Sequence, residues 1–304
     1  METGRAGPRQ VGLITWGLGL RLGTWARELW RFTRRKPLGG VSLVFLVAMV
    51  LVAIFSPWIT PHSPYENIRG AARVAPGATY WFGTDHLGRD LFSRVLIAGR
   101  ISLFIGLVVM LLGTTVGSAV GVFSAYIGGK TDLIIQRIVD GLLAFPAIIL
   151  ALALMATLGQ SLLNVILALV VVNTPRTIRT VRSAALSIKE NVYVDAARSI
   201  GASNLRVMFL HVTPNCFAPI IIMATVTLGW AILAEASLSF LGLGVPADVP
   251  TWGGMLGTMA QRFMRSAPWT VVFPGLTLTL VVMAINLLGD AMRDMLDPRL
   301  RGAR

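Results

Sequence analysis

The chain has 304 residues, of which 55% are hydrophobic and only 13% are charged. A soluble domain carries about twice that share of charged residues, so this composition excludes a soluble globular protein and predicts an integral membrane protein. The net charge of +13 suggests loops that are basic on the cytoplasmic side of a membrane, where Lys and Arg concentrate. Basic residues are not interleaved with aromatic ones, so nucleic-acid binding is not expected.

The first apolar run, residues 41–59, follows an N-terminal segment with eight basic and two acidic residues. That segment is too long for the basic region of a secretory signal, and no small-residue cleavage site ends the run. We therefore expect an uncleaved first span with the N-terminus in the cytoplasm. Residues 16–30 predict an amphipathic helix at the membrane interface.

Residues 60–99 are mixed and polar, and by alternation they form an extracytoplasmic loop. Asp85 and His86 could be metal ligands, but they lack a third partner, so turn chemistry is favoured over a metal site. The sequence thus predicts two units. Residues 1–95 hold the N-terminal cytoplasmic segment, the first span and this loop, and residues 96–304 hold the remaining spans.

Five further apolar runs follow, at residues 101–125, 133–158, 162–172, 217–243 and 269–288. Four of them reach the length of about 20 residues that a span needs. The short one continues through Pro175 towards Ile178, which predicts a span with a kink at the proline. The sequence thus predicts six spans, with both termini on one side. Gly113, Gly117 and Gly121 predict close helix packing, within the chain or with a partner.

Basic residues gather in three segments: the N-terminal segment, the loop at residues 175–214 and the C-terminal tail. Together they hold 18 of the 27 basic residues, so we expect all three in the cytoplasm. The loop at residues 60–100 carries five arginines and departs from this rule. Arg176, Arg179 and Arg182 recur at three-residue steps, and we expect them to reach lipid phosphates.

The tripeptide Gly129-Lys130-Thr131 matches the end of a phosphate-binding P-loop. A P-loop also needs a glycine five residues earlier, where this chain has Ser124, and a preceding strand in place of an apolar span. No cluster of His, Cys or carboxylate residues suggests a catalytic or metal site elsewhere. We therefore expect no nucleotide, metal or catalytic site in this chain, and an energy source outside it.

The polar stretch at residues 193–215 predicts two short helices joined at a glycine. The first helix has Asp195 on its polar face and an apolar face formed by Val192, Tyr193, Ala196, Ala197 and Ile200. Gly201 is predicted at the C′ position, because glycine enters the left-handed region without a Cβ clash. Ser203 caps the second helix, whose apolar positions are Leu205, Met208, Phe209 and Val212. Pro214 ends or kinks that helix.

This stretch resembles the EAA loop of bacterial ABC importer permeases. The family pattern is Glu-Ala-Ala, three residues, Gly, nine residues and Ile-x-Leu-Pro. The corresponding positions here are Asp195, Ala196, Ala197, Gly201, His211, Thr213 and Pro214. Asp, His and Thr thus replace the family's Glu, Ile and Leu. The histidine followed by Pro214-Asn215 is similar to the pattern of the dipeptide, oligopeptide and nickel branch of this family. An ordinary surface hairpin is the alternative interpretation.

Glu235 is an acid deep inside the fifth predicted span. An intramembrane carboxylate is costly and is by default a functional candidate, so Glu235 is a candidate residue of a translocation path. Alternatively, its side chain is hydrogen-bonded within the bundle or lies in a wide water-filled vestibule. Residues 237–244, 250–253 and 293–302 resemble the same permease branch.

The resemblance extends over residues 30–302 and implies the permease subunit of an ABC importer in the bacterial inner membrane. It implies an all-α fold with an N-terminal span, a five-span core and a cytoplasmic coupling helix at residues 190–215. The residues that would couple to a separate ATPase are Asp195, Ala196, Ala197, Gly201 and Pro214. The implied partners are a second permease, two subunits that bind ATP and Mg²⁺, an extracytoplasmic substrate-binding protein and membrane lipid.

Peptides are the favoured cargo, with nickel as the alternative. A transporter driven by an ion gradient is a different class. It would carry several titratable groups at mid-membrane and broken helices in matching halves, whereas here only Glu235 lies deep. A membrane enzyme comes third, because the sequence contains no catalytic cluster.

Overall fold

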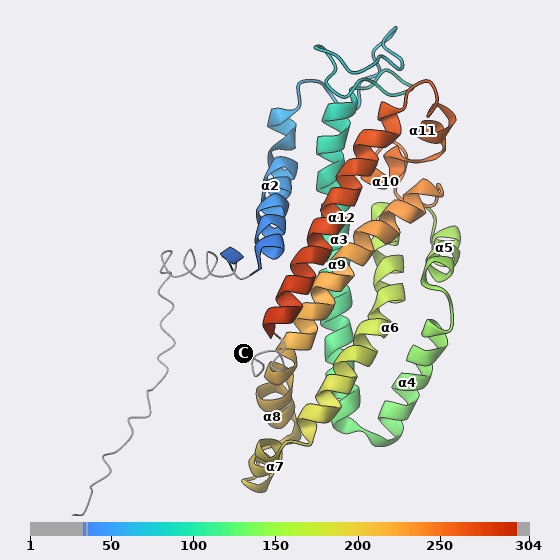
Figure 1. Ribbon diagram of the computed structural model, residues 1–304. Helices are drawn as coiled ribbons and strands as arrows, with labels where there is room; N and C mark the ends of the chain where they lie inside the picture. The colour runs from blue at the N-terminus through green and yellow to red at the C-terminus, as the bar shows by residue number, and fades with distance from the viewer. Residues whose placement is uncertain (1–32, 35, 297–304) are drawn as a thin grey trace, which may run out of the picture.

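The computed structural model describes residues 33–34 and 36–296, and this part of the chain is helical, with no strand longer than an isolated bridge (Figure 1). The long helices are α2 (Pro37–Ile59), α3 (Leu91–Ile127), α6 (Leu162–Lys189), α9 (Phe217–Phe240) and α12 (Trp269–Leu296). The shorter ones are α4 (Gly129–Leu143), α5 (Ala147–Leu158), α7 (Val192–Ser199), α8 (Asn204–Val207), α10 (Trp252–Met255) and α11 (Thr258–Arg262). The predicted interfacial helix at residues 16–30 lies outside the described residues.

Five helical stretches in the described chain are long and apolar enough to cross a membrane, and a sixth candidate is a bent pair. This pair, α4 and α5, occupies the predicted third span and is bent by 87° at residues 144–146. The bend has a local cause, because Pro146 has no N–H and disfavours a helical conformation at Phe145. The span that the sequence predicts at residues 133–158 is therefore formed by two helices with a bend between them.

Helix α3 runs through the centre of the bundle and packs against α6 along a stripe of glycines. A Cβ on Gly117 would lie 2.7 Å from the Thr177 Cβ, and one on Gly121 would lie 2.8 Å from the Ile178 carbonyl oxygen. Gly113 is looser, with the Asn173 Nδ2 3.6 Å away. The glycine stripe therefore brings two helices of the same chain together, as the predicted close packing requires.

The two ends of the bundle differ in structure (Figure 1). One end carries two irregular segments, residues 60–90 and 241–268, which we call the crown. The opposite end carries α7 and α8, within residues 190–215, which we call the hairpin. Helix α2 begins and α12 ends towards the hairpin side, where the Lys36 Nζ donates to the Asp294 Oδ2 over 2.5 Å. The described chain thus starts and finishes on one side of the bundle.

Candidate functional site

The turn of the hairpin is fixed by backbone hydrogen bonds around one glycine. Helix α7 ends at Ser199, and the Gly201 N–H donates to the Arg198 carbonyl over 2.9 Å while the Ala202 N–H donates to the Ala197 carbonyl over 3.1 Å. These two bonds form a Schellman motif, which requires a left-handed residue at C′. Gly201 has a φ of +85°, so its predicted role at the end of the first helix is confirmed.

The second arm of the hairpin continues into α9 without a break. Ser203 caps α8, as predicted, by accepting from the Arg206 N–H over 3.4 Å. A π-helical turn, Met208–Val212, and a 3₁₀ turn, Thr213–Cys216, then lead to Phe217. Pro214 lies in the 3₁₀ turn. Proline lacks an N–H and crowds the carbonyl four residues back, so it does not fit a regular α-helix. The π and 3₁₀ turns accommodate Pro214, and the helical path therefore continues through this residue instead of ending there.

One side of the hairpin is packed into the bundle. The buried apolar cluster on that side joins the hairpin to the ends of α3 and α6, and it consists of Val122, Ala125, Tyr126, Val181, Ala185, Val194, Ala197, Val207, Met208, Val212 and Cys216. Two polar contacts add to it: the Tyr126 hydroxyl pairs with the Asn204 Oδ1 at 3.0 Å, and the Lys189 Nζ donates to the Ala125 carbonyl over 3.0 Å. The hairpin is therefore held firmly at its base.

The other side of the hairpin leaves apolar residues without a partner in the described chain. Val192 and Ile200 are 84% and 86% exposed, and Leu205 and Phe209 are also exposed. The prediction that the apolar residues of α7 share one face is therefore wrong for Ala197, which is buried beside Val194 while Ala196 stays exposed. The reason is that packing against α3 and α6 decides which face of α7 is buried. The helical periodicity of α7 alone does not reveal that face.

Asp195 lies on the exposed part of the hairpin. Its carboxylate pairs with Arg198 at 3.2 Å, and two thirds of its side chain is exposed. A surface ion pair of this kind contributes little to stability, so Asp195 is available to a partner at small cost. Of the five predicted coupling residues, Asp195, Ala196, Gly201 and Pro214 are exposed and Ala197 is buried.

Glu235 is fully buried in the interior of the bundle. Its carboxylate accepts from the Ser239 hydroxyl over 2.8 Å and from the Ser102 hydroxyl over 3.5 Å. The Ser102 oxygen in turn accepts from the Trp252 N–H over 3.2 Å, and the Trp252 indole donates to the Val95 carbonyl over 3.0 Å. These bonds connect α9, α3 and α10, so Glu235 is hydrogen-bonded inside the bundle in this structure.

Two of the three arginines in α6 have acidic partners on α4. The Arg182 Nε and Nη2 bind Asp132 at 2.6 and 2.5 Å, and Arg179 pairs with Asp140. The expectation that both side chains reach lipid phosphates is therefore wrong. Sequence reasoning missed these pairs because the partners lie 39 and 50 residues away in the chain, and helical periodicity does not show which helices pack together.

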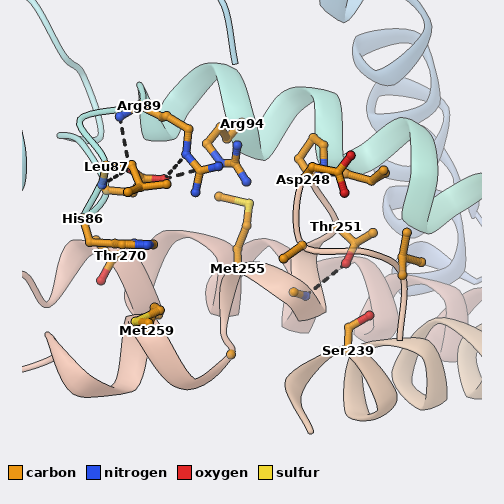
Figure 2. Close-up of a pocket in the computed structure, with 18 of the residues that line it drawn as sticks. His86, Leu87, Arg89, Arg94, Ser239, Asp248, Thr251, Met255, Met259 and Thr270 are labelled. Carbon is orange, nitrogen blue, oxygen red and sulfur yellow. Dashed lines mark hydrogen bonds and ion pairs between the residues drawn. The ribbon is translucent and has the colours of Figure 1, made fainter. Parts of the chain in front are cut away.

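The crown contains a turn built on Asp85. One carboxylate oxygen accepts from the Leu87 N–H over 2.8 Å and from the Arg89 N–H over 3.0 Å, and the other binds the Arg89 Nε at 2.6 Å (Figure 2). The predicted turn chemistry of Asp85 is confirmed. Burial lowers the pKa of the neighbouring His86 below its ordinary value, in spite of the Asp85 charge. Neither residue belongs to a metal-binding cluster within the described part of the chain.

Comparisons with known proteins give the following similarities. Residues 113–302 match the family described as "Binding-protein-dependent transport system inner membrane component", and residues 24–76 match the "N-terminal TM domain of oligopeptide transport permease C". The chain is 42% identical over 275 residues to the dipeptide transport system permease protein DppC of Alkalihalophilus pseudofirmus, covering 90% of both chains.

Two further relatives are similar over most of their length. A putative peptide transport system permease protein of Brucella suis is 43% identical over 271 residues, covering 89% of this chain and 90% of the relative. The glutathione transport system permease protein GsiD of Escherichia coli is 40% identical over 280 residues, covering 90% and 91%. A chain of the inward-facing MetNI methionine ABC transporter has a TM-score of 0.55 at 19% identity, covering 67% of this chain and 96% of that one. The last likeness shows a shared fold.

Proposed function

Because the chain belongs to the family of binding-protein-dependent transport system inner membrane components and is a permease subunit of an ABC importer, we propose that it forms half of a translocation path for peptides. The names of the similar proteins support a peptide cargo. The similar proteins are named as dipeptide, peptide and glutathione permeases, and glutathione is itself a short peptide. The second half of the path would come from a second, homologous permease.

We propose that the hairpin couples this path to a separate ATPase subunit, and that the complete importer holds two such subunits. The observation that carries this proposal is a hairpin with a buried base and an exposed apolar side, including Val192, Ile200 and Phe209. Exposed apolar groups in a polar setting mark contact surfaces between proteins. ATP and Mg²⁺ would bind to the ATPase, and Asp195, Ala196, Gly201 and Pro214 would lie at or beside the contact, with Ala197 supporting it from within.

We further propose that the hairpin faces the cytoplasm and that the crown faces the extracytoplasmic space, where a substrate-binding protein would deliver the cargo. Lys189, Arg198 and Arg206 lie at the hairpin end, which the positive-inside rule favours for the cytoplasm.

The two family matches, at residues 24–76 and 113–302, support the division into an N-terminal unit at residues 1–95 and a core at residues 96–304.

The cargo proposal is tested by uptake into proteoliposomes that hold the complete importer, ATP inside and the substrate-binding protein outside. Uptake of a labelled dipeptide that needs ATP and survives collapse of ion gradients is the expected result. Accumulation of labelled nickel instead of peptide would overturn the peptide assignment. Uptake that follows the ion gradient and ignores ATP would overturn ATP-driven transport.

The coupling proposal is tested with one charge placed on the exposed side of the hairpin. Ile200→Glu should leave folding intact, because the side chain is 86% exposed, and should reduce co-purification of the ATPase and ATP-driven uptake. Met264→Glu, at an exposed apolar residue of the crown, is the matched control and should leave ATPase binding unchanged. Normal ATPase binding by the Ile200 variant would show that the hairpin is not the docking element.

A further inference from the structure

A cavity of about 430 Å³ lies in the crown, between the start of α3, the end of α9 and the segment that carries α10 and α11 (Figure 2). Its volume falls within the range of small-molecule sites in proteins, roughly 300 to 1,000 Å³. Most of the lining is apolar and includes Leu91, Val249, Met255, Met259 and Phe263. The cavity is therefore large enough for a small molecule, and most of its lining is apolar.

One wall of the cavity carries more positive than negative charge. Asp85 binds the Arg89 Nε at 2.6 Å and lies 3.8 Å from the Arg94 Nε, so two guanidinium groups share one carboxylate. The Arg94 side chain is only 5% exposed, and its Nη1 donates to the neutral Pro64 carbonyl over 2.8 Å. A buried charge is costly unless it is paired. An anion in the cavity would complete the pairing at this wall.

A second wall carries the opposite charge. Asp248 lies on the loop at residues 245–251, lines the same cavity (Figure 2) and is exposed. Within the described residues, no Lys, Arg or His lies close enough to form an ion pair with it. A cation in the cavity would meet this carboxylate. The lining thus offers a site for a negative group and a site for a positive group in a cavity that is otherwise mostly apolar.

We propose that this cavity binds a short zwitterionic peptide, with its terminal carboxylate at Arg94 and Arg89 and its terminal ammonium at Asp248. Charge-assisted hydrogen bonds to both ends would hold the backbone, and the methionines would accept side chains of varied shape because a thioether chain is flexible. The inference rests on the proposed function in peptide import, and it adds a binding site on the permease itself at the crown.

The test measures binding of the dipeptide Ala-Phe to the complete importer in lipid nanodiscs, without the substrate-binding protein, by titration calorimetry. N-acetyl-Ala-Phe lacks the ammonium, and Ala-Phe amide lacks the carboxylate. Asp248→Asn should weaken binding of Ala-Phe by about tenfold or more and leave binding of the acetylated peptide unchanged, as expected for loss of one charged hydrogen bond. Glu66→Gln, at an exposed acid of the crown outside the cavity, is the control and should change nothing.

Arg94→Gln gives the complementary result: weaker binding of Ala-Phe and unchanged binding of Ala-Phe amide. Because Arg94 also holds the Pro64 carbonyl, this variant is informative only as a folded complex, and the exposed Asp248 keeps the test independent of it. No saturable binding by the wild-type complex, or equal losses for the free and the acetylated peptide in Asp248→Asn, would overturn the inference. Peptide uptake by the same variants, reconstituted into proteoliposomes with ATP inside and the substrate-binding protein outside, reports separately on the proposed function: ATP-driven uptake without binding in the cavity overturns the site alone, and binding without uptake overturns the import function alone.

Discussion

Glu235 is the centre of a chain of hydrogen bonds that fastens α10 to the bundle. Its carboxylate accepts hydrogen bonds from the hydroxyl groups of Ser239 and Ser102, and the Ser102 oxygen accepts one from the Trp252 N–H. Trp252 has no exposed surface, so α10 is anchored by both burial and polar contacts. The buried Glu235 carboxylate thus helps to hold α10 against the bundle in this structure. A role on the translocation path stays a prediction.

We predict that Glu235→Ala destabilises the complex while Glu235→Gln does so much less. The alanine variant leaves two buried hydroxyls without their acceptor and opens a void, which together cost about 2–5 kcal/mol. Glutamine keeps the size of the side chain and one acceptor oxygen. Thermal unfolding of the purified importer measures the difference, and peptide uptake is recorded after the same preparations are reconstituted into proteoliposomes. A Glu235→Gln complex of normal stability that transports poorly would place the side chain on the path.

Structural features that depend on neighbouring residues can be predicted from the sequence more readily than contacts between residues far apart in the chain. The turn at Gly201 could be predicted, because a left-handed residue after a helix depends only on neighbouring residues. The partners of Glu235 could not, because Ser102 lies 133 residues earlier in the chain. The same holds for Arg94 and Asp248 in the crown. Their shared cavity is formed by segments that only the folded chain brings together. In the sequence, the pattern that could have indicated this cavity is two arginines close to Asp85, which is weak by itself.

At the scale of helices, the glycine stripe of α3 decides how closely α6 approaches. A methyl group at Gly117 would lie 2.7 Å from the Thr177 Cβ and 3.2 Å from the Thr174 carbonyl oxygen, whereas one at Gly113 would meet its nearest atoms at 3.6 and 3.8 Å. The first set combines a clash with the Thr177 side chain and a tight contact with the Thr174 backbone, and the second set is ordinary contact. The two glycines are therefore alike in sequence and different in packing.

We expect Gly117→Ala to destabilise the bundle by about 1–3 kcal/mol, the usual cost of overpacking, and Gly113→Ala to be nearly neutral. The measurement is the thermal unfolding midpoint of the purified complex in one detergent. The Gly113 variant is the matched control, since it adds the same methyl group on the same helix face. Equal midpoints for both variants would contradict the close approach of α3 and α6 at Gly117.

The turn of the hairpin supports a second prediction at this scale. Gly201 has a φ of +85°, and a Cβ there would have open space around it, so Gly201→Val acts only through backbone strain of about 1–2 kcal/mol or more. We expect the variant chain to reach the membrane but to bind the ATPase poorly or to hydrolyse ATP without uptake. Asp195→Ala should have a milder effect in the same direction, because it removes only a surface carboxylate.

The control for the hairpin is Gly159→Val. Gly159 has a φ of +80° and equally open surroundings, but it follows α5, far from the hairpin in Figure 1. Its ψ of 169° lies in a region that only glycine adopts readily, so a valine there introduces at least as much backbone strain in a different place. Co-purification of the ATPase, ATP hydrolysis and uptake are measured on both variants. If the two variants lose ATPase binding equally, the effect is general strain, and the hairpin loses its special role.

The bend between α4 and α5 shows where helical periodicity stops being informative. Phe145-Pro146 marks a break, yet an apolar run of this length also fits a kinked single span. What fixes the bent form includes the pairing of α4 with α6 through Asp132–Arg182 and Asp140–Arg179. These pairs are set by the packing of distant segments, so the number of apolar runs could be predicted and the path of this one could not.

Considered as a whole, the molecule has a basic hairpin end and a crown end at which several arginines have partners. Arg89 and Arg94 share Asp85, and the Arg73 guanidinium lies over the Phe263 ring at 4.8 Å. Three of the five arginines at residues 60–100, which depart from the positive-inside rule, thus have partners at the crown end of the bundle. Their number therefore does not argue against an extracytoplasmic crown, because the rule describes charges in short loops beside the span ends rather than charges built into a folded segment.

This arrangement gives the last prediction, on the orientation of the chain. In a Cys216→Ala background, which removes the buried native thiol, single cysteines replace Ser203 in the hairpin and Ala247 in the crown, both at exposed positions. We expect a membrane-impermeant thiol reagent to label the Ala247 variant in intact spheroplasts, and the Ser203 variant only after lysis. Because both positions are exposed, a difference in labelling reports sidedness instead of burial. Labelling of Ser203 but not Ala247 in intact spheroplasts would invert the topology. It would remove the hairpin from any cytoplasmic ATPase and place the charged cavity on the wrong side to receive an incoming peptide.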